Sequence, residues 1–421
     1  MFLKEIHVKN LRCFDDVHLS FVEPDGAIRR WTVLLGENGT GKSTLLKALA
    51  LVTAGSDALS DLVIEPEDWV RHGKRFCEIE AVLVTKKMEE RPLHLRIDQG
   101  DSRSDVIVRN KEGLDALDRA LDHSTRNYFV VGFGASRRLS IVEGRRQKTS
   151  LFHSTRAESV ATLFDPNATL NPLESWAMDL DYMYAEDGTG IETVRAVLSD
   201  FLPGIRFHSI DKKKGRLLFE TDDGVVPLRA LSDGYQSAAA WIGDLLYRIT
   251  EVFEDYKSPL DARGLLLIDE VDLHLHPRWQ RQLLQFLGDR LPNFQLVVTT
   301  HSPLTAQQAG PRQLHYLTRH ADRIEIEQFT GDPRRLLVSQ LLMTDAFGIE
   351  SDESLEVQEK KARYTQLQEQ KDLSPPEQDE LKELADFLSR IPRGGRANLV
   401  YQAEQVELLQ NIQKALRGVR S

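Results

Sequence analysis

Cysteine is scarce in this chain, since only Cys13 and Cys77 occur among its 421 residues. Two cysteines give no disulfide framework, and unpaired thiols are typical of a reducing compartment. The chain also lacks any apolar run that approaches the roughly 20 residues of a membrane-spanning helix. Residues 1–10 alternate as a strand does, which disfavours a signal peptide. We therefore expect a soluble cytoplasmic protein without a membrane partner.

Positive charge is in deficit rather than in excess. The chain carries 54 Lys and Arg residues against 65 Asp and Glu residues, a formal net charge of −11. This balance argues against a protein coated with basic surface for nucleic acid. Basic residues do cluster at 212–216 and at 136–148, the latter including Arg137, Arg138, Arg145 and Arg146. Such runs are usually solvated loops, but a contact with a phosphate backbone stays open.

Apolar patterning divides the chain into an α/β part and a helical end. Hydrophobic residues make up 41% of the chain, which is enough for a large buried core. Strands are expected at 6–8, 18–21, 76–84, 93–97, 105–108, 128–132, 206–210, 216–220, 264–269, 295–299, 314–317 and 324–328. Residues 151–202 are expected to be mainly helical, with further helices after Ser232 and at 278–290. From residue 352 the sequence becomes strongly charged and predicts helices at 353–370, 376–390 and 403–416.

A complete phosphate-binding loop lies between an apolar strand at 31–35 and a helical stretch at 44–51. Its residues are Gly36, Glu37, Asn38, Gly39, Thr40, Gly41, Lys42 and Ser43, followed by Thr44. Glycines let backbone N–H groups approach phosphate oxygens, and the helix N-terminus favours an anion. Lys42 is expected at the β- and γ-phosphates, and the Ser43 hydroxyl is expected to help hold Mg²⁺. The motif predicts that the chain binds a nucleoside triphosphate.

Two carboxylates end an apolar strand far downstream of this loop. The segment 265–270 reads Leu-Leu-Leu-Ile-Asp-Glu, which is typical of a buried strand followed by acids. Asp269 is placed to orient Mg²⁺, and Glu270 is placed to accept a proton from the attacking water or to orient it. His301 follows the next apolar strand, from which an imidazole could touch the γ-phosphate.

A second anion site is predicted where a long helix begins. Ser232 and Gly234 precede that helix, and a hydroxyl, a glycine backbone and a helix N-terminus together suit a phosphate. One γ-phosphate does not need two such sites from the same subunit. The sequence therefore suggests that one protomer completes the nucleotide site of another.

These motifs together resemble the head of an ABC-type ATPase. The segments 36–43, 231–236 and 265–270 and His301 occur in the order found in such heads. The opening residues 6–14 resemble RecF and SMC heads rather than transporter ATPases, and 269–277 resembles the OLD-like branch of stand-alone ATPases. Within that branch, the layout, the segment 132–137 and the helical end resemble anti-phage ATPases, especially the PtuA family of Septu systems.

The resemblance implies an α/β fold: an ABC-type P-loop NTPase head at residues 1–330 with a helical lobe at about 151–202. Residues 331–421 would form a helical C-terminal appendage, either a partner-docking surface or a solvated brace. Ser232 and Gly234 would be the signature residues that reach the ATP of a partner protomer, and 271–276 would cross the dimer interface. His301 would be the switch histidine, with Arg12 and Phe14 near the adenine.

The sequence departs from the family pattern at two points. Asp233 replaces the usual second glycine of the signature, although this branch often carries Asp there. No glutamine is obvious in the lid loop that follows 128–132, and Gln147 is left unassigned. His274 and His276 could supply two ligands to a zinc ion, but the resemblance explains their loop better as a contact between the protomers of a dimer.

The leading hypothesis is an ATPase that uses ATP and Mg²⁺, dimerises around two nucleotides and regulates a nuclease-type effector in phage defence. No nuclease constellation is evident beyond His301, so the effector is expected to be a separate protein of the HNH type. The first alternative is a RecF-like repair ATPase that binds DNA directly through the 136–148 cluster. The second is a scaffold that ATP holds together with little functional turnover.

Overall fold

The computed structural model describes residues 1–85, 87–122, 130–139, 154–183, 189–202, 204–252, 262–321, 323–370 and 372–391. The chain divides into two compact units, Met1–Ile349 and Glu350–Ser421. The predicted helix at 403–416, most of the basic cluster at 136–148 and Gln147 lie outside the described residues. No helix in the described part is both long enough and apolar enough to cross a membrane.

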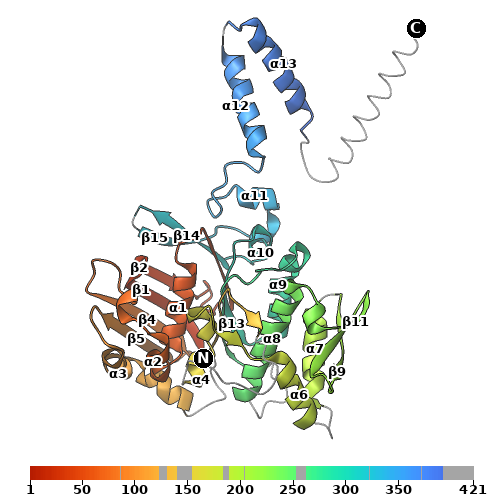
Figure 1. Ribbon diagram of the computed structural model, residues 1–421. Helices are drawn as coiled ribbons and strands as arrows, with labels where there is room; N and C mark the ends of the chain where they lie inside the picture. Colours follow the sequence, from red (N-terminus) through yellow and green to blue (C-terminus); the bar gives the residue numbers. More distant parts are fainter. Residues whose placement is uncertain are drawn as a thin grey trace. The chain divides into compact units, whose positions relative to one another are not determined.

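A six-stranded sheet forms the centre of the first unit (Figure 1). Its order is β15 (Arg323–Gln328), β14 (Leu314–His320), β3 (Trp31–Gly36), β13 (Phe294–Thr299), β12 (Gly264–Ile268) and β6 (Val130–Phe133). All neighbouring pairs are parallel except β14 and β15, which form an antiparallel hairpin. Because the carboxyl ends of parallel strands meet at one edge, the loops after β3, β13 and β12 are neighbours.

The two faces of this sheet supply two separate hydrophobic cores. In β3, Val33 and Leu35 belong to one core while Leu34 belongs to the other. In β12, Leu266 and Ile268 likewise face away from Leu265 and Leu267. Side chains of a strand alternate between faces, so an uninterrupted apolar strand indicates a sheet that is covered on both sides. The expected strands at 264–269 and 295–299 are confirmed on this basis.

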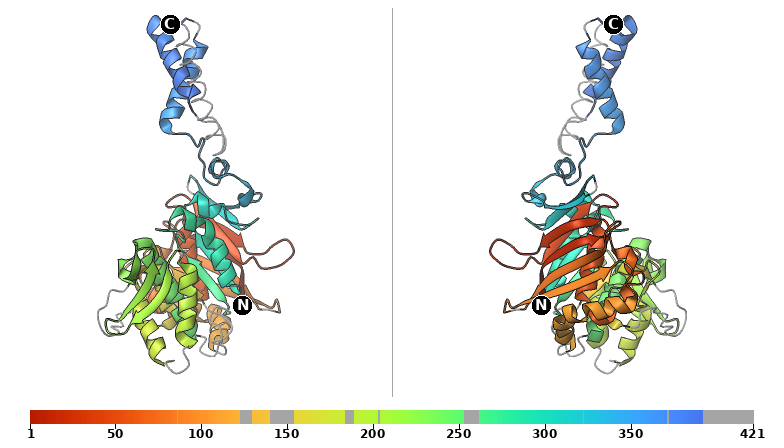
Figure 2. Two further views of the ribbon diagram at one scale, coloured as in Figure 1. Left: turned by 90° about the vertical axis from the view of Figure 1, so that its right-hand side faces the viewer. Right: turned by 90° about the vertical axis from the view of Figure 1, so that its left-hand side faces the viewer.

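An antiparallel sheet and three helices contribute to the core that contains Leu34, which we call the first core. The sheet has the order β2 (Phe14–Ser20), β1 (Phe2–Leu11), β4 (Phe76–Val84) and β5 (Glu90–Asp98), and the helices are α1 (Lys42–Thr53), α2 (Ser56–Leu62) and α3 (Arg103–Asp122). The right-hand view of Figure 2 shows this sheet in red and orange on one side of the unit. The predicted hairpin at the start of the chain and the strands at 76–84 and 93–97 are confirmed.

The strand predicted at 105–108 is wrong, because these residues lie inside helix α3. The buried positions of this helix are Val106, Asn110, Leu114 and Leu117. Their spacing of three and four residues is helical, and it becomes visible only over a window longer than the four residues from which a strand was inferred. Asn110 is buried without penalty because its amide donates to the carbonyls of Arg96 and Val106.

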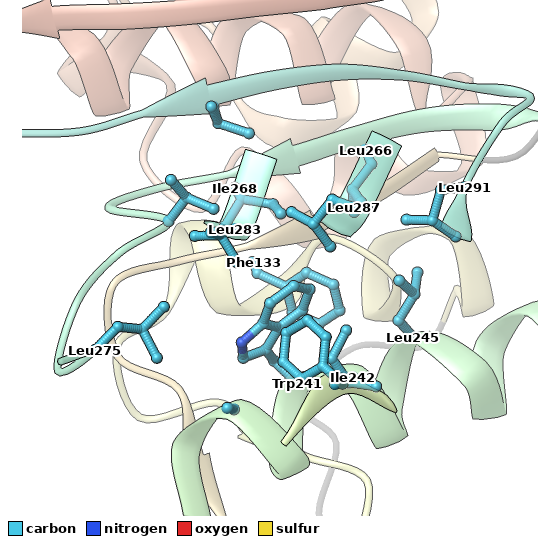
Figure 3. Packing of buried hydrophobic residues seen from close by; sticks show 14 of the residues in the cluster. Phe133, Trp241, Ile242, Leu245, Leu266, Ile268, Leu275, Leu283, Leu287 and Leu291 are labelled. Atoms are coloured by element: carbon cyan, nitrogen blue, oxygen red, sulfur yellow. The ribbon is translucent and has the colours of Figure 1, made fainter. Parts of the chain in front are cut away.

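Helices pack against the opposite face of the central sheet and make the second core. The helices are α6 (Leu173–Met183), α7 (Thr189–Phe201), α8 (Asp233–Val252) and α9 (Pro277–Arg290), beside a small sheet of β9 (Arg206–Asp211), β10 (Arg216–Thr221) and β11 (Gly224–Pro227). Trp241 of α8 lies at the middle of this core, next to Phe133 of β6 (Figure 3). The predicted helical character of 151–202 is confirmed in its described part, where α4 (Thr155–Glu158) and α5 (Ala161–Phe164) precede α6.

Short elements complete the first unit. They are the 3-10 turns η1 (Pro66–Trp69), η2 (Leu228–Ala230) and η4 (Pro333–Arg335), the paired β7 (Arg138–Leu139) and β8 (Thr169–Leu170), α10 (Pro303–Ala306) and α11 (Val338–Leu342). Leu341 and Ala346 are buried in the second core. Residues 331–349 thus pack with the α/β unit, whereas the sequence placed the domain boundary at 330.

Two antiparallel helices make up the described part of the second unit. These are α12 (Leu355–Glu369) and α13 (Pro375–Ser389), which confirm the helices predicted at 353–370 and 376–390. The guanidinium of Arg363 donates to both carboxylate oxygens of Glu380 at 2.9 and 2.8 Å. The ammonium of Lys360 lies 3.5 Å from the ring centre of Phe387. These cross-helix pairs set the register of a largely exposed hairpin.

Candidate nucleotide-binding site

The phosphate loop is a tight turn that closes over the start of β2. Gly41 has φ 94°, in the left-handed region that side chains rarely adopt. A Cβ atom at this position would lie 2.6 Å from the Phe14 ring and 2.7 Å from the Cys13 sulfur. Glycine is therefore required at 41 both by the backbone conformation and by the close approach of the β1–β2 turn.

Lys42 occupies the loop as a buried cation. Its Nζ donates to the carbonyls of Gly36 and Glu37 at 2.8 and 2.9 Å, and the residue is only 6% exposed. Burial lowers the pKa of Lys42, while the nearby Asp269 and Glu270 raise it. The amine is thus held at the mouth of the loop by neutral carbonyls, which it can exchange for phosphate oxygens.

Asp269 follows β12 and is fixed by the neighbouring strand. The Thr299 hydroxyl at the end of β13 donates to Asp269 Oδ1 at 2.6 Å. The same hydroxyl oxygen accepts the backbone N–H of Glu270 at 2.7 Å. Thr299 therefore sets the orientation of both acidic residues, and the sequence analysis did not single it out. Its position at the end of the strand before His301 is the signal that could have found it.

Glu270 has a left-handed backbone with φ 47°, which is uncommon for a residue with a side chain. Such a conformation is costly, of order 1–3 kcal/mol, and persists where surrounding groups determine it. Besides the bond to Thr299, the next peptide N–H, that of Val271, donates to the Thr299 carbonyl at 2.9 Å. The two-residue turn after β12 is thereby tied to the end of β13.

The charges of the same groups influence the pKa of the His301 imidazole. Burial and the positive charge of Lys42 lower the pKa of its imidazole, while Glu270, Asp272 and Asp269 raise it. The ring is therefore mainly neutral at pH 7. Because β3, β13 and β12 are parallel neighbours, the loops that follow them, which carry Lys42, His301, Asp269 and Glu270, lie at one edge of the sheet.

Comparison with known proteins assigns a family to this arrangement. Residues 31–306 match the AAA_21 family model, described as "AAA domain, putative AbiEii toxin, Type IV TA system". The match covers more than half of the chain. The chain belongs to the AAA_21 family. The family match and the similarity to Septu PtuA and retron proteins described below support an ABC-like ATPase of the OLD and PtuA branch.

Several curated relatives resemble this AAA_21 chain at low identity. The Septu protein PtuA of Bacillus mycoides is 25% identical over 94% of this chain and 51% of its own length. The "Retron Vc95 probable ATPase" of Vibrio cholerae is 22% identical over 78% of this chain and 77% of the relative. This chain thus spans about half the length of the Bacillus mycoides relative.

Solved structures with similar architecture include an SMC head bound to the C-terminal winged-helix domain of ScpA. It has a TM-score of 0.49 at 13% identity and covers 78% of this chain and 98% of that chain. A RecF structure has a TM-score of 0.43 at 15% identity, covering 78% and 98%.

The loop at 271–276 of the AAA_21 chain is locked to the turn after β13. Asp272 is buried and accepts hydrogen bonds from the hydroxyls of Thr300 at 2.8 and 2.9 Å and Thr305 at 3.1 Å. His274 and His276 are exposed on this loop. Among the described residues, the one group of three with ligand atoms within 4.8 Å of one another is His320, Glu325 and Glu327, so His274 and His276 are not part of it.

The signature segment contacts that same loop. A Cβ atom on Gly234 would lie 2.6 Å from the backbone carbonyl oxygen of His274, so glycine is required by the close approach. Ser232 and Asp233 are exposed at the start of α8. In the described part of the chain, no hydrogen bond joins Ser232 or Gly234 to the phosphate loop. Their assignment as residues that reach a second protomer's ATP stays a prediction.

The proposed adenine-side residues differ in exposure. Arg12 is half-buried, and its guanidinium lies 4.0 Å from the ring centre of Trp69. Burial lowers the pKa of Arg12, while Asp68 raises it. Phe14 is fully buried against the Gly41 position, so its ring supports the phosphate loop from beneath. The role of Arg12 near a base stays a prediction, and Phe14 has no face open to a base.

Two arginines contribute contacts that the sequence analysis missed. The Arg319 guanidinium, at the end of β14, donates to the Gly39 carbonyl at the tip of the phosphate loop at 2.7 Å. Arg137 is 7% exposed and lies behind the acidic turn, so it is not a surface contact for DNA as the 136–148 cluster suggested. The patterns of charge alone gave no indication that one arginine of this run is buried.

Proposed function

We propose that this chain binds ATP with Mg²⁺ and hydrolyses it at the site formed by the loops after β3, β12 and β13. The observation that carries the proposal is that the loops with Lys42, with Asp269 and Glu270, and with His301 follow neighbouring parallel strands at one edge of the sheet, where Thr299 bonds to both acidic residues. Each supplies a different requirement of phosphoryl transfer: a cation, a metal ligand, a carboxylate for water and a neutral imidazole. The AAA_21 family match supports the same chemistry.

The residues at this edge fit a magnesium–triphosphate group. The backbone N–H groups of the glycine loop and the N-terminus of α1 both favour a bound anion. Ser43 is exposed on the first turn of α1, and Asp269 offers an oxygen ligand of the kind that Mg²⁺ prefers. These two residues would hold the ion. When bound, Mg²⁺ neutralises charge on the β- and γ-phosphate oxygens.

The acidic turn supplies the remaining chemistry. Glu270 would orient the attacking water and accept its proton, because its backbone is held in place on both sides. Neutral His301 can donate a hydrogen bond to a γ-phosphate oxygen without adding a second charge beside Lys42. Lys42 would bind the β- and γ-phosphates after its ammonium releases the two carbonyl groups that it contacts.

Glu270→Gln tests the role in hydrolysis. Glutamine preserves the size of the side chain but cannot take up a proton, so turnover should fall by roughly 10²- to 10⁴-fold while ATP affinity stays close to that of the parent. Steady-state phosphate release with Mg²⁺ measures the first quantity, and titration with a fluorescent ATP analogue measures the second. Glu325→Gln, an exposed glutamate on β15, is the matched control. Equal turnover in Glu270→Gln and the parent would refute the assignment.

We further propose that two protomers associate around ATP and that the assembly regulates a separate nuclease-type effector in phage defence. Relatives named Septu PtuA and retron ATPases support a defence role, and the exposed signature residues support a site shared between protomers. The hairpin α12–α13, with its exposed charged faces, is the proposed docking element for the effector. An HNH-type nuclease is the expected partner.

Phage plating on cells carrying this gene and its neighbouring reading frames tests the defence role. The parent system should reduce plaque numbers, and Glu270→Gln should abolish that protection if hydrolysis is the regulatory event. Protection that survives Glu270→Gln would favour the scaffold hypothesis, in which ATP only holds the assembly together. Protection that persists when the neighbouring frames are removed would contradict a separate effector.

A further inference from the structure

Arg137 is a buried cation placed directly behind the acidic turn. It follows β6, and only 7% of its surface is exposed. Its Nε donates to the carbonyl of Gly134 at 3.1 Å, and its Nη2 donates to the carbonyls of Asp269 and Glu270 at 2.5 Å each. One guanidinium thus joins the loop after β6 to the two peptide units that carry the acidic side chains.

The charge of Arg137 is balanced by the carboxylates in front of it. Burial lowers its pKa to about 10, while Asp269, Asp272 and Glu270 raise it, so the group stays protonated at neutral pH. A cation behind the turn lowers the energy of holding three carboxylates close together. An unpaired buried charge would instead cost several kcal/mol.

The geometry of the Glu270 peptide depends on this contact. Its N–H donates to the Thr299 hydroxyl, and its carbonyl accepts from Arg137 and from the backbone N–H of Leu273. Side chains of β13 and of the loop after β6 therefore hold both sides of the left-handed residue. Without Arg137, the carbonyls of Asp269 and Glu270 lose a buried charged donor, and the strained backbone keeps only its bonds to Thr299 and to the Leu273 N–H. The direction of the Glu270 carboxylate would then be less well determined.

The guanidinium also rests on the helix that follows the signature segment. It lies 5.7 Å from the ring centre of Trp241 on α8, and Trp241 packs in turn on Phe133 at 5.7 Å (Figure 3). Arg137 is therefore the point at which the loop after β6, the acidic turn and α8 meet.

From these contacts we propose that Arg137 is a positioning residue for hydrolysis, which holds the Glu270 carboxylate in its productive direction without touching ATP. The inference rests on the proposed function, because it assumes that Glu270 acts on the attacking water. It assigns to Arg137 a role distinct from that of Lys42, because Arg137 faces the back of the turn and not the phosphate loop.

Arg137→Lys is the decisive variant because it keeps the charge but replaces the planar fork with a single ammonium. We expect kcat to fall at least tenfold, since small displacements of a catalytic group are costly, while KM stays within about threefold of the parent. Arg137→Met, which also removes the charge, should lower kcat further. A loss confined to KM, or no loss in kcat, would overturn the proposal.

Arg29→Lys is the matched control for a loss of stability. Arg29 is 3% exposed, precedes β3 at the opposite end of the sheet, and donates to the carbonyl of Ser20 at 2.5 Å. Both variants should lower the melting temperature, but only Arg137→Lys should lower kcat per folded molecule. Equal effects on kcat from the two variants would show that Arg137 acts only through general stability.

A double-mutant cycle with Glu270→Gln separates positioning from other roles. If Arg137 acts through the Glu270 carboxylate, Arg137→Lys should have little further effect on the residual rate of Glu270→Gln, measured with radiolabelled ATP. Multiplicative losses would overturn the inference while leaving the proposed ATPase activity intact. An inactive parent would instead contradict the proposed function itself.

Discussion

At the residue scale, the site depends on a small number of buried charges that compensate one another. Lys42 is held by carbonyls of the phosphate loop, and Arg137 is held by the backbone carbonyls of the acidic turn itself. Removing a charge from such a set leaves its partners buried and unpaired, which is more costly than losing an exposed ion pair. The effects of single substitutions should therefore be larger here than on the surface.

Lys42→Ala removes the compact cation of the loop. We expect ATP to bind about 10- to 100-fold more weakly, because a hydrogen bond to a charged group contributes about 1.5–3 kcal/mol. Isothermal titration with ATP and Mg²⁺ measures the change. Lys74→Ala, which removes an exposed lysine paired with Asp15 at 3.1 Å, should leave the affinity unchanged. Affinity equal to that of the parent in Lys42→Ala would exclude Lys42 from the phosphate site.

At the element scale, the start of α8 and the loop at 271–276 form one structural unit. Gly234 permits the carbonyl of His274 to approach the helix, and Tyr235 packs edge-to-face on Trp279 of α9 with ring centres 5.0 Å apart. The exposed Ser232 is thus presented by a helix whose first turn is fixed by its neighbours. A shift of either element should displace the other.

Gly234→Ala tests this coupling. The added methyl group would lie 2.6 Å from a backbone oxygen, so the helix or the loop must move. We expect ATP-dependent association to be lost while the circular dichroism of the helices is retained. Gly288→Ala is the control, because a methyl group there would meet the Trp31 side chain at a more tolerable 3.3 Å. Association at the parental level in Gly234→Ala would show that the close contact relaxes freely.

At the scale of the whole molecule, the sheet order decides which loops share a site. β13 lies between β3 and β12, so His301 follows the strand that separates the phosphate loop from the acidic turn, although it is 258 positions away from Ser43 in the sequence. The left-hand view of Figure 2 shows the helices and the small sheet in green. The signature segment lies at the start of one of these helices, α8. The signature segment has no hydrogen bond to the phosphate loop among the described residues, and a partner protomer as its target stays a prediction.

Ser232→Arg tests the shared site. A long cation in place of the exposed hydroxyl should block the approach of a second protomer, so the ATP-bound form of Glu270→Gln/Ser232→Arg should stay monomeric. Light scattering after size-exclusion chromatography, with and without ATP, measures the association. Ser209→Arg, on β9 of the small sheet, serves as the control. A persistent nucleotide-dependent dimer in the Ser232→Arg variant would reject the shared-site proposal.

Much of the fold was predictable because its signals are local. The phosphate loop, the apolar strands β12 and β13 and the helix α9 were each identified from a few consecutive residues, and the structure has them within a residue or two. The error at α3 has the same origin, because a short apolar run such as 106–108 fits a strand as well as a helix. Longer periodicity, visible in the burial of Val106, Asn110 and Leu114, corrects it.

The sequence by itself determined the residue types of the site: the glycines and lysine of the loop, the paired acids and the histidine. These follow from chemistry that tolerates few substitutes. Only the tertiary structure decided that Arg137 is buried behind Glu270 and that Phe14 supports Gly41 from beneath. Such roles depend on contacts between segments that are distant in the sequence. The residue type of an arginine in a basic run does not show whether its side chain faces solvent or the core.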